Sequence, residues 1–176
     1  MSGHNKWSQI KHKKEKTDAQ KSKVFGKFAK LITDAAKKAK GNMADPTLKA
    51  AIEKAKSYNM PNDNIDRAIK KATEAGGAAL ETITYEAYGP GGTALIIEAL
   101  TDNRNKAAQE VKFILSKHSL ALAGIGAASW AFTKTHEGWV PQTKVPISET
   151  DTVALQKLIE ELEESDEIQE IFTNAE

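Results

Sequence analysis

The 176-residue sequence contains no cysteine, which excludes disulfides, thiolate metal sites and a cysteine nucleophile. It also has no apolar run long enough to cross a bilayer. In a secretory signal an apolar segment follows the N-terminal basic residues, and no such segment follows the N-terminal lysines of this sequence. These absences predict a cytoplasmic protein without a membrane partner.

Arginine is scarce, because only 2 of the 25 basic residues are arginine and the others are lysine. The planar arginine side chain is the usual reader of guanine edges, whereas lysine acts as a mobile point charge on phosphates. A lysine-dominated surface therefore predicts backbone contacts with modest sequence discrimination.

The charged residues are sorted along the chain. Residues 1–40 hold twelve lysines and three acidic residues, a formal charge of +9, and the first eighty residues sum to +10. Residues 81–176 sum to −9, with ten acidic residues and one lysine after residue 147. A lysine-dense segment is drawn to polyanions, because neutralised phosphates release condensed counterions. The pattern favours nucleic acid as the partner; the alternatives are a soluble helix face and docking onto the acidic tail.

The first 77 residues are predicted to form a basic helical domain behind a flexible arm. Residues 1–17 are polar and lack apolar periodicity, which is typical of an arm that orders only on meeting phosphate. Apolar residues recur at three- and four-residue steps over 18–40, and Gly41 is a natural stop. Asp45-Pro46 predicts the start of a second helix, and a third runs from Pro61 to about Glu74. Three short amphipathic helices over 18–77 predict a small bundle.

Residues 78–176 are predicted to form a ferredoxin-like α/β domain, so that the chain as a whole is α+β. Residues 82–88 are β-prone, a Gly-rich turn follows at 89–92, and 93–100 is typical of a buried strand. A helix over 104–118, strands over 128–133 and 139–147, a helix from Ser148 and a strand over 167–173 follow. This order predicts a βαββαβ arrangement, with two helices on one face of a four-stranded sheet. Trp130 and Phe132 share a strand face, and we expect burial against the helices.

No constellation of residues indicates catalysis. The four histidines lack metal-ligand spacing, and helical periodicity places most carboxylates of 160–170 on a solvated face. The loop at 89–92 lacks the Lys-Ser/Thr of a nucleotide-binding loop and precedes a strand. The aromatic signature with which some four-stranded sheets stack RNA bases is absent. We expect a non-enzymatic protein without cofactor, metal or small-molecule substrate.

Seven blocks of sequence resemble one known family. They are residues 3–7 (GHNKW), 10–14 (IKHKK), 59–72 (NMPNDNIDRAIKKA), 85–92 (YEAYGPGG), 101–105 (TDNRN), 129–132 (SWAF) and 169–174 (QEIFTN). In content and order they resemble the YebC/PmpR family, bacterial proteins named as probable transcriptional regulators, with mitochondrial relatives that are translational activators. The resemblance implies a basic helical N-terminal domain, α/β domains behind it, and action on nucleic acid without catalysis. Family members carry a further α/β domain between Phe132 and Val140, where this chain has only residues 133–139.

We predict a non-enzymatic, nucleic-acid-binding regulator of gene expression, in the first instance a DNA-binding transcriptional regulatory protein. A translational activator bound to the ribosome through ribosomal RNA is the alternative hypothesis. Two others are a protein–protein adaptor that uses the acidic segment 160–170, and self-association through oppositely charged ends. The candidate nucleic-acid-binding residues come from the arm, the first and third helices and the first strand–helix junction of the second domain: Lys6, Trp7, Lys11, His12, Lys13, Lys14, Lys16, Lys21, Lys23, Lys27, Lys30, Arg67, Lys70, Lys71, Asn103 and Arg104.

Overall fold

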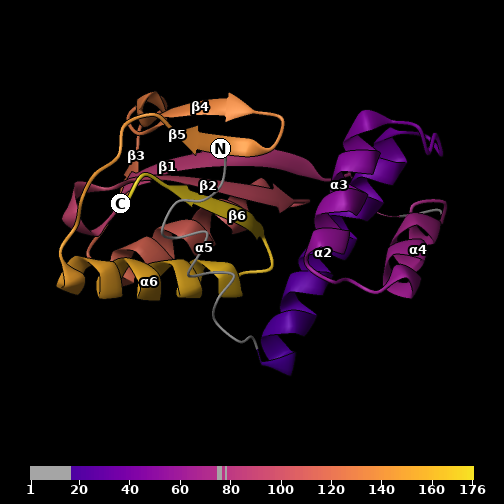
Figure 1. Cartoon of the computed structure of the whole chain (residues 1–176), viewed down its shortest axis with the longest axis horizontal. Helices are drawn as coiled ribbons and strands as arrows, with labels where there is room; N and C mark the ends of the chain where they lie inside the picture. Colours follow the sequence, from indigo (N-terminus) through magenta and orange to yellow (C-terminus); the bar gives the residue numbers. More distant parts are fainter. Residues whose placement is uncertain (1–16, 75–76, 78) are drawn as a thin grey trace. The chain divides into compact units, whose positions relative to one another are not determined.

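The structure is a computed structural model that describes residues 17–74, 77 and 79–176 (Figure 1). The described residues form two units. The helical unit comprises those up to Leu80, and the sheet unit begins at Glu81 and contains both sheets. The α+β class expected from the sequence is confirmed.

Three helices make up the helical unit: α2 (Asp18–Lys38), α3 (Pro46–Ser57) and α4 (Asn62–Lys71). Thr17 begins α2 with a reciprocal cap, because its hydroxyl accepts from the Gln20 N–H and the Gln20 side chain accepts from the Thr17 N–H. Asp45 caps α3 ahead of Pro46 in the same way that its sequence signal predicts. The predicted helices are therefore confirmed, with ends within a few residues of those expected.

The core of the helical unit is built from the apolar stripes of these helices. Its buried members are Phe28, Ile32, Ala35, Ala36, Leu48, Ala51, Ala55, Met60, Ile65 and Ala68. The Phe28 ring lies against Tyr58 with centroids 5.1 Å apart, and the Thr33 hydroxyl donates to the Ala68 carbonyl at 2.9 Å. These contacts join α2 to the other two helices and fix which faces remain outside the core.

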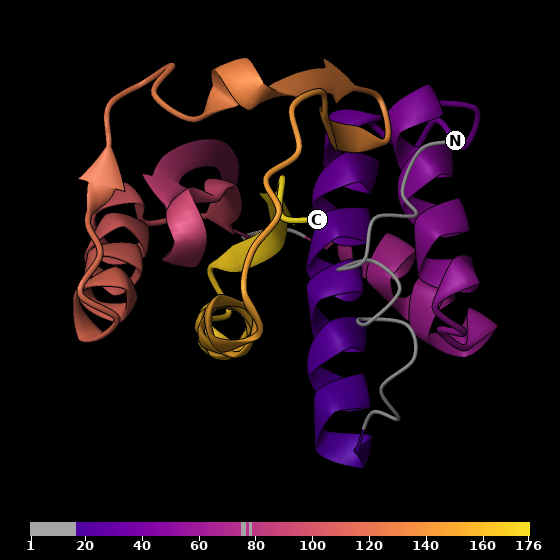
Figure 2. The same cartoon turned by 60° about the vertical axis from the view of Figure 1, so that its left-hand side comes forward.

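The main sheet of the sheet unit has four antiparallel strands in the order β3-β1-β2-β6. The strands are β1 (Glu81–Tyr88), β2 (Ala94–Thr101), β3 (Leu122–Ala123) and β6 (Ile168–Thr173). Strands β1 and β2 pair over eight residues, with the short helix η1 (Pro90–Gly92) between them. Helices α5 (Arg104–Lys117) and α6 (Glu149–Glu164) cover one face (Figures 1 and 2). Leu95 and Ile97 of β2 belong to the core beneath them.

A short hairpin covers the opposite face of this sheet. Strands β4 (Phe132–Thr135) and β5 (Gly138–Pro141) pair with each other in a separate sheet, preceded by the 3₁₀ helix η2 (Ser129–Ala131). Ala94 and Ile96, which alternate with Leu95 and Ile97 along β2, pack there with Phe132. Because both faces of β2 are covered, this strand is buried along nearly its whole length.

The strand membership of the sheet differs from the prediction. Two helices do lie on one face of four strands, as expected. Residues 82–88, which the predicted βαββαβ order does not count among its four strands, form a central strand of the sheet. Strand β1 lies between β2 and β3. In the βαββαβ order this central position belongs to a strand that follows the first helix. Residues 132–135 and 138–141 instead form the separate hairpin. The tight β1–β2 turn favours local pairing over eight residues, whereas β5 ends at Pro141, which lacks an N–H.

Trp130 is not buried as expected. Residues 129–131 are a 3₁₀ helix rather than part of a strand, and a turn of three residues sends positions 130 and 132 in different directions. Phe132 is buried at 6% exposure, as predicted, whereas Trp130 is 59% exposed.

Candidate nucleic-acid interface

Seven of the predicted contact residues lie outside the described residues. These are Lys6, Trp7, Lys11, His12, Lys13, Lys14 and Lys16. The other nine lie on α2, on α4 and at the start of α5.

The predicted lysines of α2 occupy two sides of that helix. Lys23, Lys27 and Lys30 follow at steps of four and three residues, so they share a side that lies away from Phe28 in the core. Lys21 lies seven residues before Phe28, so it is on the side of the helix that faces the core. It is exposed because this first part of α2 extends past the end of the core.

The lysine side of α2 continues into its last turns. Lys37 lies seven residues after Lys30 on the same side, and Asp34 lies between them. The Asp34 carboxylate accepts from the Lys38 ammonium at 2.6 Å, so the one acidic group of this stripe is paired within the helix. Lys37 and Lys38 also interact favourably with the negative end of the helix dipole.

Three predicted basic residues come together on α4. Arg67, Lys70 and Lys71 are all exposed, and their spacing of three and four residues places them on one side of the helix. Ile65 and Ala68 occupy the other side, in the core. The Arg67 guanidinium is held along the helix because it donates to the Asn64 side-chain oxygen at 2.8 Å and to the Asp63 carbonyl at 3.4 Å.

The helical unit is cationic overall. Residues 17–80 carry thirteen basic and seven acidic side chains, a formal charge of +6. Since the apolar stripes are used in the core, this charge is carried by the outer faces of the helices.

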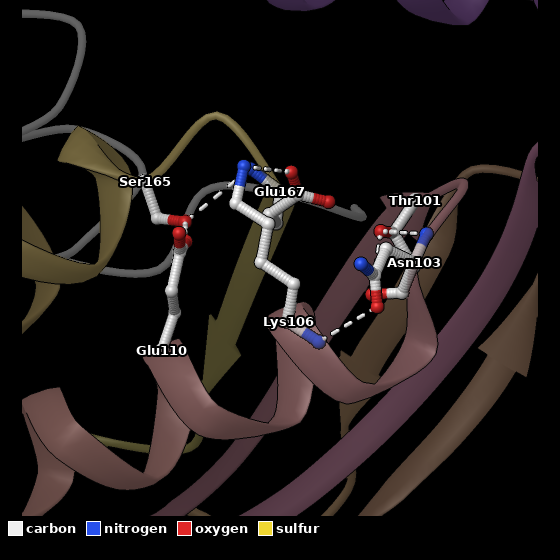
Figure 3. A network of polar contacts seen from close by, with 6 residues as sticks. All are labelled: Thr101, Asn103, Lys106, Glu110, Ser165 and Glu167. Atoms are coloured by element: carbon white, nitrogen blue, oxygen red, sulfur yellow. Dashed lines mark hydrogen bonds and ion pairs between the residues drawn. The ribbon is translucent and has the colours of Figure 1, made fainter.

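Asn103 and Arg104 have structural partners in the sheet unit. The Asn103 side chain caps α5 by accepting from the Lys106 N–H at 3.0 Å, and its own N–H donates to the Thr101 hydroxyl at 2.9 Å (Figure 3). Arg104 donates two hydrogen bonds, of 2.8 and 3.2 Å, to the two carboxylate oxygens of Glu81. Hydrogen bonding to Arg104 lowers the pKa of the Glu81 carboxyl. Both residues hold the strand–helix junction, and a direct contact with nucleic acid remains a prediction for them.

The same end of the sheet unit contains a polar network that the sequence pattern did not indicate. The Lys106 ammonium lies 3.2 Å from the carboxylate of Glu167, a residue only 7% exposed, and the Ser165 hydroxyl donates to Glu110 (Figure 3). These contacts join the start of α5 to the turn between α6 and β6. We interpret the network as structural, because its contacts run between residues of α5 and of the turn before β6.

A loop with exposed apolar side chains was also missed. Residues 124–130 follow β3 and include the first two residues of η2, and Glu86 of β1, which is only 7% exposed, lies beneath them. Oxygen atoms of this carboxylate accept from the backbone N–H groups of Gly126, Ala128 and Ser129 at 2.7, 3.0 and 2.6 Å. Burial by itself raises the pKa of Glu86, but these backbone hydrogen bonds outweigh it and lower the pKa overall. The Gly-Ile-Gly sequence at 124–126 is the one local signal of such a loop.

Within the part of the chain that the structure describes, no group of three or more His, Asp or Glu side chains could hold a metal ion. No helix there is sufficiently long and apolar to traverse a bilayer. The fold and its outer helix faces thus define a two-unit α+β protein with a cationic helical unit.

The chain belongs to the TACO1/YebC family. The N-terminal domain of TACO1/YebC proteins matches residues 5–75, and their second and third domain matches residues 80–137 and 134–175. The resemblance drawn from the sequence blocks is therefore confirmed.

Several relatives are named as probable transcriptional regulatory proteins. One from Thermoanaerobacter pseudethanolicus is 54% identical over 76% of this chain and 55% of its own length, and one from Desulfosudis oleivorans is 46% identical over 100% and 72%. The chain thus spans about half the length of the first of these. A crystal structure of a conserved hypothetical protein from Aquifex aeolicus matches with a TM-score of 0.78 at 31% identity, covering 98% of this chain and 97% of that one.

Proposed function

We propose that this chain is a non-enzymatic regulator of gene expression that binds nucleic acid through its helical unit. The observation that carries the proposal is the placement of Arg67, Lys70 and Lys71 on one exposed side of α4, away from the core. The lysine side of α2 adds further positive charge in the same unit. Such side chains hold phosphates and release counterions, whereas they carry little information about base sequence.

The nucleic acid is proposed to be DNA, with ribosomal RNA as the alternative. The names of the relatives support transcriptional regulation. A chain with 23 lysines and two arginines can recognise phosphates in either polymer, so the charge pattern is compatible with both.

The test is the salt dependence of binding to duplex DNA and to structured ribosomal RNA. For duplex DNA the logarithm of the association constant should fall with the logarithm of the salt concentration, by about 0.9 for each neutralised phosphate. Replacing Lys70 and Lys71 by alanine should weaken binding to every sequence and reduce the slope by about 1 for each lysine that contacts phosphate. A matched control replaces Lys144 and Lys157, two exposed lysines of the acidic sheet unit.

Equal effects of the two double variants would contradict the assignment of the interface to the helical unit. Binding that ignores salt would contradict phosphate recognition altogether. Crosslinking in cells then separates the two polymers, because a transcriptional regulator should yield chromosomal DNA and a translational activator ribosomal RNA.

We also propose that the turn of the β4–β5 hairpin marks the point at which longer relatives carry a further domain. The two matched stretches of the second and third domain meet at residues 134–137, which contain this turn. A folded domain inserted between His136 and Glu137 should therefore leave the urea midpoint of the sheet unit unchanged. A lowered midpoint would contradict the proposal.

A further inference from the structure

Three large apolar side chains are exposed on or against the 124–130 loop. Ile125 is completely exposed between two glycines, Trp130 is 59% exposed and Tyr88 is 38% exposed. Gly126 has a φ of +87°, a conformation that glycine adopts without strain and that turns the chain at the tip of the loop. Single exposed apolar side chains are common on protein surfaces, whereas several that gather in one place mark an interaction site.

Hydrogen bonds hold the two rings in defined positions. The Trp130 indole N–H donates to the Tyr88 hydroxyl at 2.9 Å, and that hydroxyl donates to the Ala127 carbonyl. The Glu86 carboxylate fixes the loop backbone from below through three N–H groups. Since the donor of each ring is already used, the remaining contact surface of Trp130 is its aromatic face.

The segment that carries this loop lacks acidic residues, although the sheet unit as a whole carries −9. Residues 111–136 contain no aspartate or glutamate and include Lys112, Lys117 and Lys134, of which Lys117 is paired with Glu161 of α6. The carboxylate of Glu86 is matched by three backbone dipoles beneath the loop. A phosphodiester chain that approaches the loop therefore meets no carboxylate from the segment that carries it.

We infer that the 124–130 loop binds unpaired nucleobases, with Trp130 as a stacking surface, Tyr88 as its support and the exposed Ile125 as a further apolar contact. Exposed aromatic faces stack on unpaired bases of any sequence, and this stacking is a main contact of proteins that bind single strands. Bases inside a duplex are already stacked and offer no free face. The inference rests on the proposed function, and adds to its phosphate contacts a second contact in the sheet unit that distinguishes single strands from duplexes.

The test measures fluorescence anisotropy of labelled single-stranded RNA, single-stranded DNA and duplexes of the same sequence, across a salt series. Trp130→Ala should weaken binding to single strands by roughly 5- to 100-fold, which corresponds to the loss of one stacked base, and leave duplex binding within about twofold. The salt slope should not change, because no phosphate contact is removed. Phe113→Ala is the matched control, since Phe113 is an exposed aromatic (62%) on α5 of the same unit, and it should change neither affinity.

Ile125→Ser provides a second variant that does not affect the core, because its side chain is entirely exposed. It should weaken single-strand binding while the urea midpoint stays at the parent value. Whichever single strand shows the larger loss, RNA or DNA, identifies the natural source of the bases.

Two outcomes would overturn the inference and leave the proposed function intact. In the first, Trp130→Ala and Ile125→Ser bind single strands as well as Phe113→Ala does, while Lys70 and Lys71 remain necessary for binding. In the second, the loop variants abolish self-association of the protein and do not weaken single-strand binding. Equal losses on single strands and duplexes would also overturn it. A parent protein that binds neither polymer at low salt would overturn both proposals.

Discussion

Replacing Glu86 by glutamine is expected to destabilise the sheet unit and to loosen the 124–130 loop. One carboxylate oxygen of Glu86 accepts from Ala128 and Ser129, and the other accepts from Gly126 at 2.7 Å. Glutamine retains one carbonyl oxygen, but its NH₂ group is a donor and would face the third N–H. The change therefore leaves a donor without an acceptor at a buried site, since Glu86 is only 7% exposed.

The magnitude follows from these three bonds. An unpaired buried donor costs about 1–3 kcal/mol, and the two remaining bonds lose the strength that a charged acceptor gives them. We expect the free energy of unfolding to fall by about 2–4 kcal/mol.

The effect should depend on pH. The pKa of Glu86 is lower in the folded chain than in the unfolded one, so the ionised carboxyl stabilises the fold above about pH 4.3. That stabilisation disappears as the pH falls through the folded-state pKa. Because glutamine does not titrate, the difference in stability between the parent and Glu86→Gln should shrink toward acid pH.

The assay is urea unfolding followed by tryptophan fluorescence, combined with hydrogen exchange of the Gly126, Ala128 and Ser129 amides. These amides should exchange much faster in Glu86→Gln. The control is Glu81→Gln on the same strand, since Glu81 is exposed and its partner Arg104 is exposed as well. A Glu86→Gln midpoint equal to that of the control, with the three amides still protected, would refute the reasoning.

Two further substitutions test other parts of the fold. Asn174→Ala removes the acceptor of the buried Ala94 N–H, a 2.7 Å hydrogen bond at the start of β2, and should lower the free energy of unfolding by about 1–3 kcal/mol; an unchanged urea midpoint would contradict this. Asp45→Ala removes the cap that accepts from the Leu48 N–H at 3.0 Å and should cost about 0.5–2 kcal/mol. In Asp45→Ala, hydrogen exchange of the backbone amides should become faster only in the first turn of α3. Unchanged protection of these amides would contradict the role of Asp45 as a cap.

The helices could be predicted from the sequence because their signals are local. Asp45 and Ser148 each lie directly before a helix, and Pro46 begins α3. The hydroxyl of Ser148 accepts from the Asp151 N–H. The basic side of α4 was predictable for the same reason, since three residues at helical spacing share a side wherever the helix lies. For Lys70 and Lys71, position in the sequence alone was enough.

The strands were harder to place because pairing joins distant segments. Residues 82–88 were recognised as β-prone, but nothing within them indicates that they lie between β2 and β3. Trp130 was misplaced because alternation predicts a strand where the chain forms a 3₁₀ turn. The sequence indicates Arg104 as a candidate binding residue, but its two hydrogen bonds to Glu81, 23 residues earlier, depend on how the strand and the helix pack.

By itself the sequence determined the sorting of charge, the starts of the helices and the family to which the chain belongs, since each depends on residues close together or on simple sums along the chain. Tertiary structure alone decided which strand became central, which carboxylate fixed the 124–130 loop and which tryptophan stayed in water. Glu86 meets its three amide partners from about forty residues away, and such partners are selected by the packing of the whole sheet rather than by any neighbouring residue.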